Sequence, residues 1–198
     1  MCRVYSGILV VIWILAPYSI LQHVEVFPVL WMPQLSIDKF IAVNFHSMWF
    51  YYSYYLLLGL VGLTVEKKLF IRYLYTVGWV TAVSHAFFLF MPNGVSREDI
   101  AIDSAPWFYQ ILAIVDQPRN AFPSLHASLS VVAAIAFQSS AHFPKWSKPV
   151  VWLWVLGIFW STIALRQHVS LDLLGGMVLA GVMWWMIPKT REMKYHGV

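Results

Sequence analysis

The residues most able to do chemistry lie in two short segments, FPSLHAS at 122–128 and LRQHVSLDLLGG at 165–176. In the second segment His168 and Asp172 are four residues apart, so a helix would place both side chains on one face within reach of each other. A carboxylate in that position orients an imidazole and stabilises its cation. The spacing therefore predicts a nucleophilic histidine held by an aspartate.

The first segment predicts a second reactive imidazole at the start of a helix. Pro123 and Ser124 precede His126, and a proline followed by a hydroxyl near the cap is typical of a helix N-terminus. Backbone N–H groups at such an end attract anions. Two imidazoles, one of them beside an anion-attracting helix end, indicate phosphoryl chemistry.

The composition indicates the medium in which these segments work. Of 198 residues, 60% are hydrophobic and 11% are charged, and the mean hydropathy is +0.68. A soluble domain carries about a quarter of charged residues, so we predict an integral membrane protein with a single domain, residues 1–198. The single cysteine, Cys2, excludes an intrachain disulfide and a multi-cysteine metal site. We expect lipid partners and no nucleic-acid partner.

Apolar runs close to the length of about 20 residues that spans a bilayer predict an all-α bundle of six transmembrane helices. The runs lie at 4–21, 45–65, 69–91, 124–141, 150–165 and 171–187. The first has no small-residue cleavage site, so we interpret it as a retained span. We interpret 23–44 as an interfacial segment. The polar gap at 92–123 is long enough to be functional, and the motif-bearing part of the chain is 92–176.

Basic residues predict the orientation of the bundle, because short cytoplasmic loops carry more Lys and Arg. One side of the predicted membrane has Arg3, Lys67, Lys68, Arg72, Lys145, Lys148, Lys189, Arg191 and Lys194. The other side has only Lys39, Arg97, Arg119 and Arg166. We therefore expect both termini to be cytoplasmic and both histidine segments to face the opposite side. A bacterial inner membrane is the expected setting.

The two segments resemble motifs of the type 2 phosphatidic acid phosphatase (PAP2) superfamily. The family's second motif, Pro-Ser-Gly-His, corresponds to PSLH at 123–126, with leucine in the glycine position. Its third motif, Ser-Arg, five residues, His, three residues, Asp, corresponds to ST at 161–162, His168 and Asp172, with Arg166 one helical turn after the threonine. These forms are similar to the branch that includes inositol phosphorylceramide synthases and related bacterial membrane lipid phosphatases.

The family's first motif, Lys, six residues, Arg-Pro, does not occur in this chain. Arg97, directly after the third apolar run, stands where that motif would fall. Arg119, seven residues before His126, is a second candidate for the same role. The absent lysine leaves the binding of the phosphate to other residues.

The resemblance implies a role for each residue of the core trio. His168 would attack phosphorus and form a phosphohistidine, and Asp172 would accept a hydrogen bond from the other ring nitrogen. His126 would protonate the departing lipid oxygen and then activate the water or alcohol that resolves the intermediate.

The resemblance also implies which groups bind the phosphoryl oxygens. Arg166, Arg97 and Arg119 are the candidate cations, and Ser124 with the free amides of the helix start would add neutral donors. No metal or other cofactor is required. Catalysis of this type is mainly positioning and charge stabilisation.

The implied function is that of a membrane phosphatase of phospholipid metabolism, which hydrolyses a lipid phosphate or pyrophosphate at the extracytoplasmic face. A phosphotransferase that passes a phospho-headgroup to an alcohol would use the same residues. A third hypothesis is a metal-dependent hydrolase with His126, His168 and Asp172 as ligands, which Arg166 disfavours because it would repel a cation. A fourth is a non-catalytic protein with a relic motif, in agreement with the missing first motif.

Two features outside the trio have structural interpretations. The pair Gly175-Gly176 follows Asp172, and small residues there would let two helices approach closely around the site. His85 lies within the third apolar run beside Thr81 and Ser84, and we interpret it as an interhelical hydrogen-bonding residue.

Overall fold

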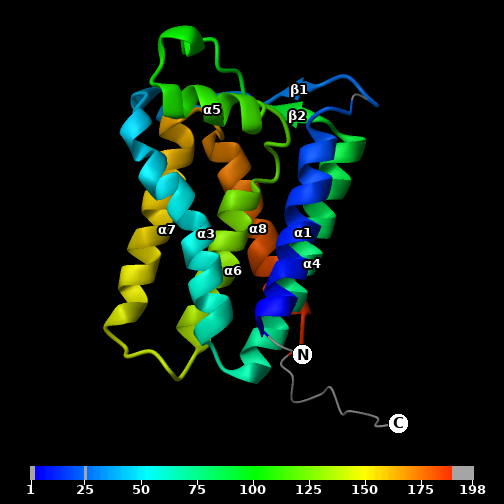
Figure 1. The fold of residues 1–198 in the computed structure, drawn as a ribbon, viewed down its shortest axis with the longest axis vertical. Helices are drawn as coiled ribbons and strands as arrows, with labels where there is room; N and C mark the ends of the chain where they lie inside the picture. The colour runs from blue at the N-terminus through cyan, green and yellow to red at the C-terminus, as the bar shows by residue number, and fades with distance from the viewer. Residues whose placement is uncertain (1–2, 25, 189–198) are drawn as a thin grey trace.

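The computed structural model describes residues 3–24 and 26–188, and the basic residues of the chain end, Lys189, Arg191 and Lys194, lie outside this range, as does Cys2. The fold is a bundle of long helices (Figure 1). These helices are α1 (Arg3–Leu21), α3 (Met48–Thr64), α4 (Lys67–Phe90), α6 (Leu125–Ser139), α7 (Ser147–Ala164) and α8 (Ser170–Met186). Short elements join them: β1 (Leu30–Trp31), α2 (Ser36–Phe40), η1 (Phe45–Ser47), β2 (Asn93–Gly94), η2 (Ile102–Ser104) and α5 (Trp107–Val115).

The helical class predicted from the sequence is confirmed, and each predicted apolar run overlaps one long helix. Three of these helices, α1, α4 and α7, are long and apolar enough to cross a membrane. The others are shorter, with 17 residues in α3, 15 in α6 and 17 in α8. Several apolar helices thus fit an integral membrane protein, and the crossing of all six stays a prediction.

Helix α6 occupies the centre of the bundle, between α3 and α8 (Figure 1). Every residue from Leu125 to Ala134 is buried, and half of them are alanine or serine. Small side chains let helix backbones approach closely, which favours packing where no water drives association. The helix that begins with the first histidine segment is therefore surrounded by the others.

Two glycines of α8 permit a close approach to the start of α6. A methyl group on Gly176 would overlap the carbonyl oxygen of Ser124 and lie 3.0 Å from Cβ of Ala127. A methyl group on Gly175 would overlap the ring of Phe122. The sequence-based interpretation of this glycine pair is confirmed, because any side chain there would separate the two histidine segments.

We expect Gly176→Ala to lower the free energy of unfolding by about 1–3 kcal/mol, because the added methyl group overpacks a backbone contact. Gly181→Ala is the matched control on the same helix, since nothing lies within 4 Å of a methyl group there. It should leave stability unchanged or raise it by up to about 1 kcal/mol through the better helix propensity of alanine. Thermal unfolding in detergent would compare them, and equal stability of the two variants would contradict the prediction.

The connecting segments cover one end of the bundle. Strands β1 and β2 pair in parallel, with Leu30 opposite Asn93, and Gly94 forms an antiparallel bridge with Arg119. Helix α5 lies across the same end (Figure 1). The gap at 92–123, predicted only as a polar loop, therefore contains a helix and a strand that tie it to the segment before α3.

Candidate functional site

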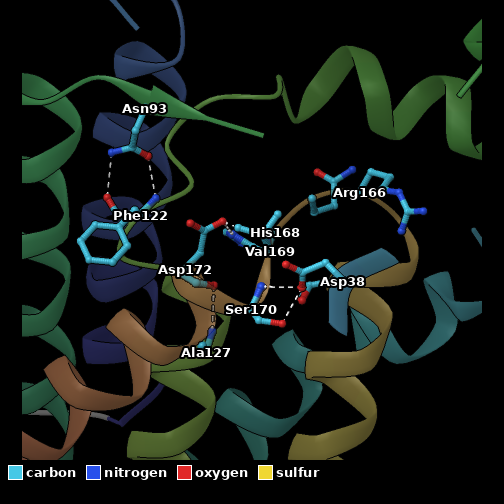
Figure 2. A network of polar contacts seen from close by, with 12 residues as sticks. Asp38, Asn93, Phe122, Ala127, Arg166, His168, Val169, Ser170 and Asp172 are labelled. Carbon is cyan, nitrogen blue, oxygen red and sulfur yellow. Dashed lines mark hydrogen bonds and ion pairs between the residues drawn. The ribbon is translucent and has the colours of Figure 1, made fainter. Parts of the chain in front are cut away.

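The second histidine segment forms the turn between α7 and α8. Nδ1 of His168 lies 3.5 Å from Oδ2 of Asp172, and both side chains are buried (Figure 2). The same Oδ2 accepts a hydrogen bond of 3.0 Å from the amide of Val169. His168 precedes the N-cap residue of α8, so the predicted pairing on one helix face is wrong in its geometry. The pair meets because Asp172, in the first turn, reaches back over the helix start.

The contact between His168 and Asp172 is longer than an ordinary hydrogen bond. Nδ1 of His168 and Oδ1 of Asp172 have no hydrogen-bond partner among the described residues. The 3.5 Å separation is an ion-pair distance, and catalytic hydrogen bonds are often long before substrate binds. A modest rotation of the imidazole would convert the contact into a hydrogen bond.

The first histidine segment starts α6, as predicted. Ser124 is the N-cap residue, and its Oγ accepts a hydrogen bond of 3.2 Å from the amide of Ala127. His126 follows in the first turn, with its ring centroid 5.5 Å from that of His168 in an edge-on arrangement. The structure thus brings the two predicted imidazoles together from segments 42 residues apart (168 − 126).

Two tyrosines of α3 hold the ring of His126. The ring centroid of Tyr51 lies 4.5 Å from it and that of Tyr54 lies 4.6 Å from it. Nε2 of His126 is buried and has no hydrogen-bond partner among the described residues. An imidazole held on two sides with a free nitrogen is positioned to exchange a proton with a bound group.

Arg97 contacts the turn that carries His168. Its Nη2 donates to Oε1 of Gln167 at 2.5 Å and its Nε donates to the carbonyl oxygen of Arg166 at 3.2 Å. The side chain is buried. Arg97 therefore lies beside the histidine turn, where it both shapes the turn and adds positive charge.

Arg166 is directed away from the pair of His168 and Asp172 (Figure 2). Its Nε donates to Oδ2 of Asp99 at 2.6 Å, and its Nη1 donates to the carbonyl oxygens of Ile41 and Ile163 at 3.1 Å. Its backbone has a φ of 55°, in the left-handed region. In this conformation the guanidinium fixes the turn to the covering loops.

The last predicted cation, Arg119, lies in the covering layer rather than in the turn. It is half-buried and forms the bridge to Gly94. The strand β2 that it joins also contains Asn93, which contacts the first histidine segment. Arg119 is thus placed at the same end of the bundle as the two histidines.

The sequence analysis did not identify two residues that position the site, Asn93 and Asp38. Asn93 donates to the carbonyl oxygen of Phe122 at 2.9 Å and accepts from its amide at 2.6 Å, so one side chain holds the peptide before the first segment (Figure 2). Oδ1 of Asp38 accepts from the amide of Ser170 at 2.8 Å and from its hydroxyl at 2.5 Å. The partners are 29 and 132 residues away, so no local spacing marks them.

We expect Asn93→Ala to destabilise the protein by about 1–3 kcal/mol, because the partly buried peptide of Phe122 loses two hydrogen bonds. Activity should fall as well, since that peptide leads into Ser124 and His126. Thermal unfolding and a rate measurement on the same preparation would test this. Unchanged stability would contradict the role of Asn93.

Asp116 forms a polar network next to His126. Its Oδ2 accepts from the hydroxyl of Tyr51 at 2.5 Å, and its Oδ1 accepts from Tyr18 at 2.8 Å and from Gln22 at 2.9 Å. Tyr51 is also one of the two rings packed on His126. The sequence showed Asp116 only as one more acid of the loop, and the contact with α1 and α3 becomes visible only in the fold.

A small cavity adjoins both histidines. It has a volume of about 30 Å³ and is lined by His126, His168, Tyr18, Asn120 and apolar residues of α1 and α6. A single water needs about 10–15 Å³ of such volume. The cavity is thus large enough for a water beside the imidazoles.

Tyr109 of α5 holds the turn from above. Its hydroxyl donates to the carbonyl oxygen of Leu165 at 2.9 Å. Burial raises the pKa of this phenol, and Asp99 raises it further, against the opposing effect of Arg97 and Arg166. Tyr109 therefore stays a neutral donor to the turn at physiological pH.

The remaining sequence-based predictions concern metals and His85. Within 3–24 and 26–188 no group of three or more His, Cys, Asp or Glu side chains has an arrangement that could hold a metal ion. His85 is buried in α4, and its ring packs against Trp13 of α1 and Phe88. Its Nε2 has no hydrogen-bond partner in the described part of the chain.

One comparison with known proteins gives a match. The family model described as the PAP2 superfamily matches residues 68–195, which include both histidine segments. No curated protein and no solved structure matches the chain significantly.

Proposed function

The chain belongs to the PAP2 superfamily, and from this membership we propose that it is a membrane phosphatase that cleaves a lipid phosphate or pyrophosphate through a phosphohistidine. The family implies a phosphatase-type phosphoesterase activity. The observation that carries the finer proposal is the buried meeting of three groups: His168 is 3.5 Å from Asp172, and its ring centroid is 5.5 Å from that of His126.

The choice of attacking atom follows from which ring nitrogen of His168 faces Asp172. Nδ1 of His168 faces Asp172, so Nε2 is the nitrogen that attacks phosphorus. The N–P bond forms while the bond from phosphorus to the lipid oxygen breaks, and His126 gives its proton to that oxygen. His126 then takes a proton from a water, which attacks phosphorus and releases phosphate and free His168.

The phosphoryl oxygens need positive charge and hydrogen-bond donors. Arg97 lies beside the turn, and the first amides of α6 after Ser124 form a helix start that attracts anions. Arg166 would bind a phosphate once its guanidinium has released Asp99. Arg119 would contribute its positive charge from the covering layer. Stabilisation by such pre-placed donors is a large part of catalysis at phosphorus.

The site lies at the end of the bundle that the covering segments close (Figure 1). With six spans and the excess of basic residues on the other side, this end would face the extracytoplasmic surface of a bacterial inner membrane, and both termini would be cytoplasmic. A lipid phosphate would reach the histidines near headgroup depth.

A phosphotransferase is the second candidate function, and the burial of the site favours it. His126 and His168 are only 8% and 4% exposed, and the adjoining cavity is about 30 Å³. A site that admits little bulk water protects a phosphoenzyme from hydrolysis until an alcohol acceptor binds. The resemblance to the inositol phosphorylceramide synthase branch agrees with this alternative.

The test is phosphate release by the purified chain from phosphatidic acid, phosphatidylglycerol phosphate and polyprenyl pyrophosphate, with EDTA present. We expect release from at least one lipid, undiminished by EDTA, because no step requires a metal. Loss of activity in EDTA, restored by a divalent ion, would refute the metal-independent mechanism. Parallel reactions with alcohol acceptors would identify transfer by a new phosphorylated product, and no reaction with any lipid or acceptor would favour a non-catalytic protein.

A further inference from the structure

A large groove runs between α1 and α4, starting at the end of the bundle opposite to the histidines. It encloses about 940 Å³, and Arg3 and Lys67 lie at its polar end. The two helices begin at this end and run side by side (Figure 1). The lining on α4 extends from Lys67 to Ala82, a distance of about 22 Å at 1.5 Å per residue. That length exceeds half of the hydrocarbon core of about 30 Å, so the groove can hold an extended acyl chain.

The polar end of the groove is cationic and partly fixed. Nη1 of Arg3 donates to the carbonyl oxygen of Leu63 at 2.8 Å, and its guanidinium lies 5.0 Å from the ring centroid of Phe70. Lys67 is exposed at the first position of α4. The neighbouring Glu66 is turned to the loop after α6, where its Oε1 accepts from the amide of Ala141 at 2.6 Å. The first turns of α1 and α4 contain no acidic residue, so the two cations are placed to attract an anion.

The rest of the groove is apolar and open. Trp13 and Trp79 are 48% and 59% exposed along it. Gly78 lies in the floor of the groove. A methyl group on this residue would project into open space, since no atom lies within 4 Å of it. The indole Nε1 of Trp13 donates to the carbonyl oxygen of Gly78 at 3.4 Å, which closes the space between the helices beneath the groove. A chain lying on Gly78 would lie beside the indole of Trp13.

We propose that this groove is a binding site for an anionic phospholipid, with the phosphate on Arg3 and Lys67 and one acyl chain along Gly78. A zwitterionic lipid offers the same chains, but its own cation offsets the phosphate, so the two basic residues select the anionic lipid. The site is separate from the histidine pair, and the proposal does not depend on the proposed function.

Native mass spectrometry of the full chain in detergent tests the site, with dioleoyl phosphatidylglycerol and dioleoyl phosphatidylcholine as probes. We expect the wild type to retain the anionic lipid preferentially, and Arg3→Gln with Lys67→Gln to weaken its retention by about 10-fold or more. Lys145→Gln with Lys148→Gln is the control, because it removes two positive charges outside the groove, one just before α7 and one in its first turn. This control should bind like the wild type.

Three more variants separate the groove from general membrane affinity and from misfolding. Gly78→Leu fills the floor and should reduce retention of both lipids, whereas Gly59→Leu, which also enters open space but on α3, should reduce neither. Lys67→Gln alone keeps the contacts of Arg3 with α3 and should give an intermediate loss. Equal retention of the two lipids by the wild type, or full retention by the double variant or by Gly78→Leu, would overturn the proposal.

Discussion

Replacement of His168 by alanine is expected to lower the rate of phosphate release by about 10³-fold or more, since the nucleophile that forms the covalent intermediate is gone. The enzyme should also lose an acid-labile, alkali-stable phosphoenzyme that rapid quenching of the wild type would trap. Initial rates with whichever lipid the substrate panel identifies, and phosphoenzyme yield, are the two measurements.

The control for His168 has to separate chemistry from folding. His168 is 4% exposed, so the alanine variant leaves a space, and His168→Gln provides a second variant of similar volume that still cannot form the intermediate. His142→Ala removes a histidine whose Nδ1 lies 3.0 Å from the carbonyl oxygen of Thr64, at the far end of the bundle. It should retain the wild-type rate within about two-fold, as surface substitutions usually do. A folded His168→Gln variant with wild-type turnover would refute the nucleophile.

The variant Asp172→Asn should lower the rate by about 10²-fold or more while the fold is kept, because it removes a charge rather than a contact. Oδ2 of Asp172 accepts from the amide of Val169 at 3.0 Å and also lies 3.5 Å from Nδ1 of His168. An amide oxygen in its place can still accept from Val169. It carries no full negative charge, however, so it stabilises less the cationic imidazole that forms when His168 is phosphorylated.

Asp38→Asn is the matched control for Asp172→Asn, because both carboxylates accept hydrogen bonds from the start of α8. Asp38 binds Ser170 and contacts no imidazole in the described structure. Its replacement should lower the unfolding temperature with less than about a 10-fold effect on the rate of the folded protein. Rate and thermal unfolding, measured on both variants, distinguish the roles. Equal losses of rate in the two variants would assign Asp172 to the helix cap alone.

Residue pattern alone was enough for the helical class and for the ends of the main helices. The apolar run at 124–141 predicted α6, and Pro123 with Ser124 predicted its start, because capping is a local interaction that a few neighbouring residues determine. Gly175 and Gly176 likewise predicted a close approach of helices, since only the absence of a side chain permits one. The number of helices that cross the membrane was not reached in this way, because α3, α6 and α8 have 17, 15 and 17 residues, fewer than the about 20 that span a bilayer.

The arrangement of charges around the site depended on the tertiary structure. Sequence order placed Arg166 beside His168, yet the left-handed backbone at Arg166 directs its guanidinium to Asp99. Asn93 and Asp116 looked like ordinary loop residues, but their partners Phe122 and Tyr51 are supplied by segments that only folding brings near.

The sequence by itself thus determined which groups can do chemistry here: two imidazoles, a carboxylate and a few cations on apolar helices. These follow from residue type and short spacing, which the chain carries before it folds. Only the tertiary structure decided that His126 lies between Tyr51 and Tyr54, and that Asp172 reaches His168 across a helix start. Such contacts depend on which helices pack together, and burial in that packing is what turns separate polar side chains into a site.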